Sequence, residues 1–115
     1  MKPNYNKAVK RIFAQLNNLA YQRELDDQLN PIFEKMNQWK LGTISSIEIS
    51  DTLFDFVKGE SKDLYFKYTS GMNDMMVARA FVMGYIGRDE IPDNIFDLIQ
   101  DQIHFCQQDI KREQD

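Results

Sequence analysis

The sequence of 115 residues contains few of the residue types on which metal, redox and nucleophilic chemistry depend. Its only cysteine, Cys106, excludes a disulfide within the chain and a cysteine-based zinc site. Its only histidine, His104, follows Asp101 at the spacing used in di-iron bundles, but such bundles need this motif on two helices. The sequence also lacks a glycine-rich phosphate-binding loop. We therefore predict a protein that is not an enzyme and that holds no metal or other cofactor.

Long apolar runs and an excess of positive charge are also missing. No run of 18 apolar residues occurs, and residues 1–10 lack the apolar region of a secretory signal peptide. The formal net charge of −4 disfavours binding to nucleic acids and to anionic membranes. We therefore expect a cytoplasmic protein with no nucleic-acid and no membrane partner.

The apolar residues that are present recur at intervals of three and four, which predicts helices along almost the whole chain. An amphipathic helix is expected over residues 5–22. Pro31 is expected to begin the next helix, because proline is favoured at the first helical position, and Gly42 to follow its end. For residues 23–30 the sequence allows two conformations. They form either a loop or an N-terminal extension of this second helix that contains a kink. The apolar stripe of the second helix consists of Ile32, Met36 and Trp39.

A third helix is expected over residues 46–58, because Ser45 and Glu48 form a capping-box pattern and Gly59 follows the apolar stripe. Ser61 is expected to cap a short fourth helix, with a short strand over residues 63–68 as the alternative. The side chains predicted to be buried by the third helix are Ile47, Phe54 and Val57. The aromatic residues Tyr65, Phe66 and Tyr68 are predicted to lie in the core and at an interface.

The C-terminal half of the chain predicts two more helices. Residues 75–86 carry one charge and are apolar on all sides, which indicates a central, buried helix that ends at Gly87. The last helix is expected to run from Pro92 to Arg112 without interruption. We therefore predict an all-α fold of a single domain over residues 1–115, a compact bundle or an irregular array of five to six helices.

Arg79 is the charge that needs an explanation, because it lies on the most apolar of the predicted helices. An arginine buried there without a partner is costly, so we expect a structural ion pair with Asp74 or with an acid of residues 46–58. The alternative is a pocket in which Arg79 meets an anionic ligand or a partner carboxylate against an adaptable apolar wall. The candidate residues of this ligand- or partner-binding site are Arg79, Met72, Met75, Met76 and Met83.

Two other patterns have simpler structural explanations. A helix-turn-helix over residues 31–58 would place Glu48, Asp51 and Asp55 against DNA phosphates, which repel carboxylates. His104 and Cys106 are two residues apart on a helix and point in different directions, so they cannot act as base and nucleophile.

The apolar arc of the last helix is wider than one helix seam needs, which favours self-association. We therefore predict a protein-interaction module that self-associates or binds a protein partner through a methionine- and aromatic-rich helical surface. A homodimer or another symmetric homo-oligomer is expected, with the last helix at the contact. The alternative function is a small-molecule-binding or regulatory protein with its pocket at Arg79. The interface residues predicted on the last helix are Ile99, Ile103, Cys106 and Ile110.

Overall fold

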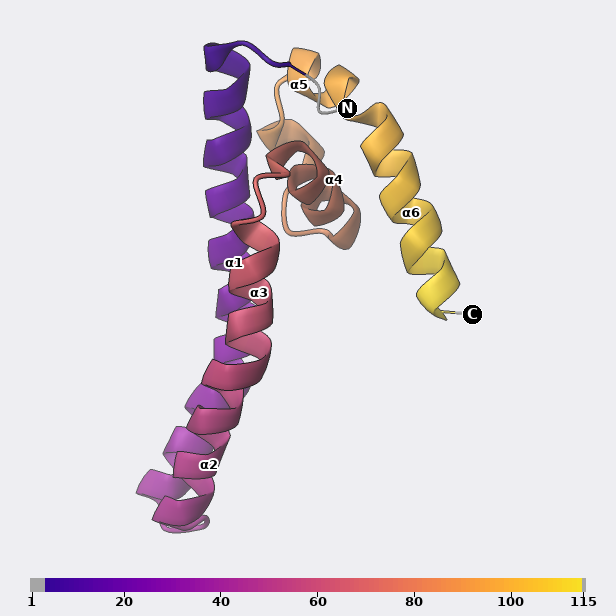
Figure 1. The fold of residues 1–115 in the computed structure, drawn as a ribbon. Coiled ribbons are helices and arrows are strands. Elements are labelled where there is room, and N and C mark those ends of the chain that lie inside the picture. The colour runs from indigo at the N-terminus through magenta and orange to yellow at the C-terminus, as the bar shows by residue number, and fades with distance from the viewer. Residues whose placement is uncertain (1–3, 115) are drawn as a thin grey trace.

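The computed structural model describes residues 4–114, and within them the secondary structure is helical, which confirms the predicted all-α class. Residues 1–3, part of the N-terminal stretch considered above, and residue 115 lie outside the described part. Figure 1 shows the helices in order along the chain. They are α1 (Lys7–Lys40), α2 (Ser46–Phe56), the π-helical turn η1 (Val57–Ser61), α3 (Lys62–Tyr68), α4 (Asn73–Met83), the 3₁₀ turn η2 (Arg88–Glu90), α5 (Asp93–Leu98) and α6 (Gln100–Gln114).

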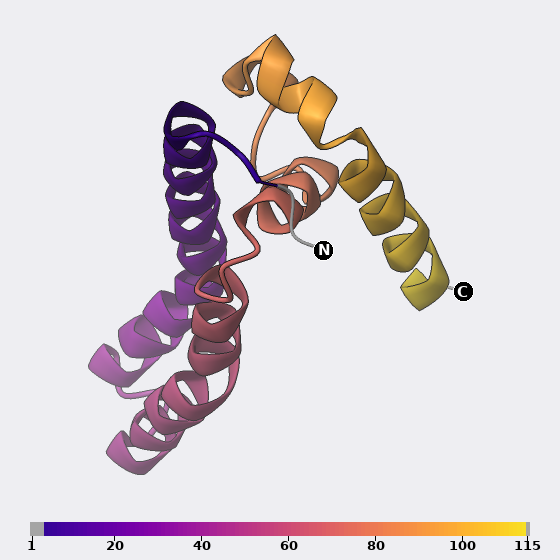
Figure 2. The ribbon, with the colours of Figure 1, turned by 45° about the horizontal axis from the view of Figure 1, so that its top comes forward.

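The first helix is one continuous element of 34 residues. It begins after Asn6, whose side chain accepts a hydrogen bond of 2.9 Å from the amide of Val9, and it includes Pro31. The prediction that Pro31 begins a new helix was therefore wrong, and residues 23–30 are helical. Proline removes one backbone hydrogen bond and favours a kink, and Figure 2 shows the helix changing direction about midway along its length.

The segments α2, η1 and α3 follow one another without a gap and form a second long rod. Ser45 caps its start as predicted, accepting a hydrogen bond of 3.1 Å from the amide of Glu48. The predicted end at Gly59 and the predicted cap at Ser61 were wrong, because the π turn continues through both. On a regular helix Phe56 and Leu64 would be roughly 80° apart, and the extra residue of a π turn reduces this to about 20°. The π turn thus keeps both side chains directed at α1.

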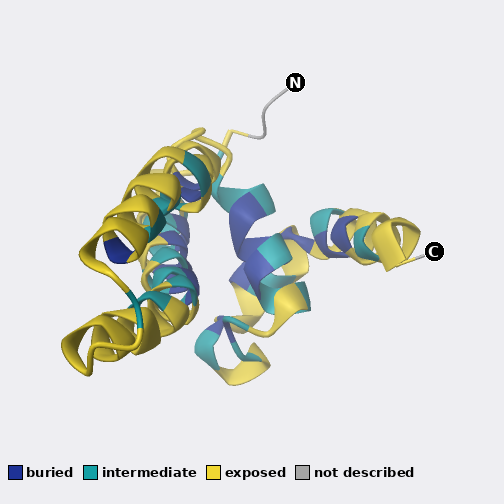
Figure 3. Ribbon diagram, turned by 90° about the horizontal axis from the view of Figure 1, so that it is seen from below, coloured by how far each residue is buried: buried dark blue, intermediate teal, exposed yellow. Residues whose placement is uncertain are grey.

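The two rods form an antiparallel helical hairpin whose far half projects from the rest of the molecule (Figure 1). Gly42 allows the tight connection, since its backbone has a φ of 81°. Near the tip, the indole nitrogen of Trp39 donates a hydrogen bond of 3.1 Å to the hydroxyl of Ser46. We call residues 25–61 the arm. Ile49 is the one buried residue of the arm, and most of the arm is drawn as exposed in Figure 3.

The core lies at the other end, around α4. Val77, Ala78 and Ala80 are fully buried there, which confirms the prediction of a central helix. This helix ends at Gly84, whose φ is 88°, and not at Gly87 as predicted. The buried core residues are Phe13, Leu16, Ala20, Leu64, Tyr68, Met76, Val77, Ala78, Ala80, Ile86, Ile91, Ile95, Ile99, Ile103 and Cys106.

The predicted last helix is two helices. The backbone leaves the helical conformation at Ile99, with φ −112° and ψ 17°, so α5 and α6 have different directions. No glycine or proline marks this position. The break lets Ile95 and Ile99 be fully buried while α6 lies against α4, so tertiary packing decided it and local propensity did not.

The molecule is elongated, with extents of 52 × 35 × 27 Å. Its radius of gyration is 17.4 Å, whereas a compact domain of this length has about 13 Å. The projecting arm accounts for the difference. Among the helices of residues 4–114, none combines the length and the apolar character that crossing a membrane requires.

Candidate protein-interaction surface

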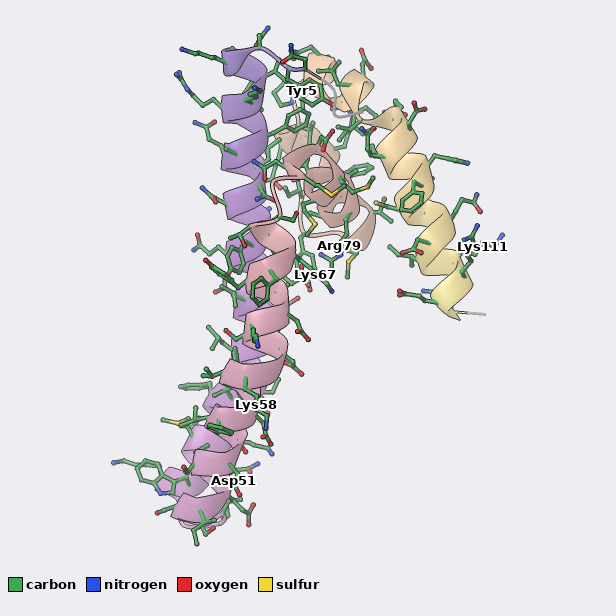
Figure 4. The ribbon with its side chains drawn as sticks, viewed as in Figure 1. Tyr5, Asp51, Lys58, Lys67, Arg79 and Lys111 are labelled. Atoms are coloured by element: carbon green, nitrogen blue, oxygen red, sulfur yellow. The ribbon has the colours of Figure 1, made fainter. Side chains whose placement is uncertain are left out.

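Arg79 forms the structural ion pair that the sequence predicted, but with a different partner. Its two terminal nitrogens donate to the two carboxylate oxygens of Glu24 at 2.9 and 3.1 Å. The hydroxyl of Tyr68 donates to the same carboxylate at 2.8 Å. Asp74 and the acids of residues 46–58 were therefore the wrong candidates, because α1 and not α2 passes beside Arg79 (Figure 4).

The charged groups of this cluster are paired with each other. Burial opposes the charge of Glu24, but the hydrogen bonds from Arg79 and Tyr68 lower the pKa of this carboxyl below its ordinary value. Burial and the bond to Glu24 raise the pKa of Tyr68, whose ring also stacks on Tyr21 at a centroid distance of 4.9 Å. The cluster ties α1, α3 and α4 together, and a bidentate carboxylate already occupies the guanidinium that an anionic ligand would need.

The four methionines do not gather around Arg79. Met76 is buried, Met75 is half-buried, and Met72 and Met83 are exposed. Met72 and Met75 line a hollow of about 760 Å³ whose walls do not include Arg79. Asp74 is the acidic residue in the wall of this hollow. Its carboxylate accepts hydrogen bonds from Tyr5 at 3.0 Å and from Gln102 at 3.3 Å. Burial and the bond to Asp74 raise the pKa of Tyr5 to about 12.

The residues predicted as an interface on the last helix lie mostly inside the chain. Ile99, Ile103 and Cys106 are buried in the core, and Ile110 is half-buried. Burial raises the pKa of the Cys106 thiol, whose sulfur is 3.8 Å from that of Met75. The wide apolar arc was predicted for a single last helix, but its residues are divided between α5 and α6. The side chains in the centre of this arc are buried in the core of the same chain.

Most of the exposed large apolar side chains are on the arm. Seven exposed apolar side chains lie on one side of the hairpin, and we call them the apolar face: Leu29, Phe33 and Met36 from α1, and Ile47, Leu53, Phe54 and Val57 from α2 and η1. At about 100° per residue, the three on α1 fall within roughly 60° and the four on α2 and η1 within roughly 120°.

A hollow on the opposite side of the hairpin, lined by a majority of polar residues and called the polar hollow here, indicates that the two apolar stripes share one side. This hollow of about 500 Å³ lies between the two helices. At about 100° per residue, Asp27, Pro31 and Lys35 lie more than 100° from the centre of the apolar stripe on α1, and so do Thr52 and Asp55 from that on α2. The walls of the hollow are Asp27, Gln28, Pro31, Ile32, Lys35, Thr52, Asp55, Phe56 and Glu60. The arm therefore has one apolar and one mainly polar face.

The prediction that the third helix buries its apolar stripe was wrong. Ile47, Phe54 and Val57 share a face as their spacing indicated, but they are 74 %, 63 % and 67 % exposed. On α1, Phe33 is 65 % exposed. No element of residues 4–114 covers this face. Periodicity identifies which side chains share a face, and it does not show whether another element reaches that face.

The core part of the prediction for the aromatic residues after the arm is confirmed for one of the three. Tyr68 is in the core, whereas Tyr65 and Phe66 are exposed on α3. Comparisons of the chain with protein-family models, with curated proteins and with solved structures found no match. The function is therefore inferred from the surface itself.

Proposed function

We propose that this protein is a non-enzymatic protein-interaction module whose contact surface is the apolar face of the arm. The observation that carries the proposal is the exposure of seven large apolar side chains on one side of a two-helix projection. Contiguous apolar patches of more than a few hundred Å² are uncommon on monomeric proteins and mark interaction sites. Phe33, Phe54 and Met36 are of the types enriched at interface cores.

The form of the arm favours a helical partner. A layer of two helices cannot bury its own apolar face, and a second layer of helices is the usual complement. The alternative function, an anionic-ligand pocket at Arg79, is disfavoured by the bidentate pairing of that side chain with Glu24. A cytoplasmic location belongs to the proposal, and the unpaired, buried Cys106 supports it.

Site-specific photocrosslinking tests the proposal in cells that make the protein. A photoreactive phenylalanine analogue replaces Phe54 on the apolar face or, as a matched control, Phe105, which is similarly exposed on α6. We expect protein adducts from position 54 that are lost when Leu53 is changed to Asp, and none from position 105. Equal adduct yields from both positions, or none from position 54, would contradict the proposal.

A further inference from the structure

The arm has the architecture of one half of a four-helix bundle. Its two antiparallel helices bury one residue, Ile49, between residues 25 and 61, so the seam between them is not a core of its own. We infer that the occupant of the apolar face is a second copy of this chain, which brings its own arm to complete a four-helix bundle with twofold symmetry. This inference depends on the proposed function and specifies its partner.

The amount of exposed apolar surface fits such a dimer. The seven exposed side chains of the apolar face present on the order of 700 Å² per chain, close to the roughly 800 Å² that each partner contributes to a standard interface. The core end does not obstruct the face. At about 100° per residue, the core side chains of α1, including Phe13 and Ala20, lie on the side of the polar hollow and away from the apolar face.

Charges along the two edges of the apolar face are arranged so that the face is complementary to itself. At about 100° per residue, Asp26 lies just beyond the apolar stripe of α1 near the core end, and Lys40 bounds this stripe at the tip. Beside the stripe of α2 and η1, Asp51 lies nearer the tip and Lys58 nearer the core end. Figure 4 labels Asp51 and Lys58 on this rod. The ammonium of Lys58 lies 5.1 Å from the ring centre of Phe54, which places it at the border of the apolar face.

All four edge charges are exposed, and within residues 4–114 none of them belongs to an ion pair. Two twofold arrangements are possible. If the axis runs along the arm, α1 of each copy packs against α2 of the other copy. Lys40 of one copy then meets Asp51 of the other, and Asp26 meets Lys58. If the axis runs across the arm, each rod packs against the same rod of the other copy. Lys40 of one copy then meets Asp26 of the other, and Asp51 meets Lys58. Opposite signs meet in both cases, a pattern that a foreign helical partner does not require.

Sedimentation velocity with matched aspartate variants tests the inference. The wild-type protein is expected at twice the mass of the 13.6 kDa chain. Phe54→Asp is expected to sediment as a monomer with unchanged helical circular dichroism, because this side chain is exposed within one chain. Phe105→Asp introduces the same change at a similarly exposed phenylalanine of α6 and is expected to remain a dimer.

A charge reversal supplies a second test that does not depend on an apolar substitution. Lys58→Glu places like charges together twice in either arrangement, so the dimer should dissociate with a dissociation constant about 3- to 30-fold higher. Adding Asp26→Lys restores affinity if the axis runs along the arm, and adding Asp51→Lys restores it if the axis runs across the arm. If Phe54→Asp loses helicity, this charge series decides the question.

A wild-type protein with the mass of one chain up to about 100 µM would overturn the inference, since an interface of this size supports tighter binding. So would a Phe54→Asp variant that is folded and still dimeric. The experiments distinguish failure of this inference from failure of the proposed function. Crosslinked adducts from position 54 with a different protein, and none at twice the chain mass, would retain an interaction module and reject self-association.

Discussion

The core end and the arm share the helix α1, yet they differ in what surrounds its side chains. At the core end, Phe13 and Ala20 are buried, and ion pairs connect α1 to distant segments, from Glu24 to Arg79 and from Arg23 to Glu90 at 2.7 Å. In the arm the same helix is mostly exposed. A helix continues wherever its local hydrogen bonds form, whereas burial depends on which other elements reach it. One helix can therefore serve both as a core element and as a projecting surface.

The largest expected contrast is between an apolar truncation in the core and one in the arm. Ile95→Ala should lower the free energy of unfolding by about 2–5 kcal/mol, because a fully buried side chain leaves a cavity. Phe54→Ala, measured on the dissociated monomer, should change it by less than about 0.5 kcal/mol. Urea unfolding followed by circular dichroism measures both. Equal losses would show that the arm is part of the cooperative core.

Arg79→Ala should cost about 3 kcal/mol of unfolding free energy, because it leaves the largely buried carboxylate of Glu24 without its charged partner. The double variant Arg79→Met with Glu24→Gln should recover most of this loss, since it removes the charge and keeps an acceptor for Tyr68. Urea midpoints of the two variants provide the comparison. If Arg79→Ala lowered the unfolding free energy by less than about 1 kcal/mol, the ion pair would contribute no more to stability than an exposed one, and the prediction would be wrong.

Acidification should weaken the core end. Arg23 and the amide of Gly87 lower the pKa of Glu90 to about 2, and the pKa of Glu24 is also lowered. A carboxyl with a lowered folded-state pKa stabilises the fold above its unfolded pKa of about 4.3, and this stabilisation is lost as the pH falls through the folded pKa. The urea midpoint should decline between about pH 4.3 and 2, and less steeply in Glu90→Gln. A midpoint that does not vary over this window would contradict the prediction.

The smallest expected effect is a gain of stability in the arm. Gly59→Ala should stabilise the protein by about 0.5–1 kcal/mol, because Gly59 is helical and a Cβ there would meet no atom within 4 Å. Thermal unfolding followed by the fluorescence of Trp39, the only tryptophan, reports on the arm directly. As the control, Gly84→Ala should destabilise the protein, since the φ of Gly84 is 88°. A loss of stability in Gly59→Ala would show that the π turn requires glycine.

The candidate surface was only partly predictable. The spacing of Ile47, Phe54 and Val57 placed them on one face, but their prediction as buried residues was wrong because nothing within the described chain covers them. The need of Arg79 for a carboxylate followed from the cost of a buried charge. The sequence did not predict its partner Glu24, which is 55 residues away on α1. The short connections between the helices do not determine which helices come into contact.

The sequence by itself determined the helical class, the cap at Ser45, the turn at Gly42 and the central position of residues 75–86, because capping, backbone freedom and apolar periodicity are properties of a few neighbouring residues. Tertiary structure alone decided that the chain breaks at Ile99 and that Glu24 meets Arg79. It also decided that the apolar stripes of α1 and α2 combine into one uncovered face. These outcomes depend on packing between segments far apart in the chain, whose free energy exceeds the local preference for or against a helix at any one residue.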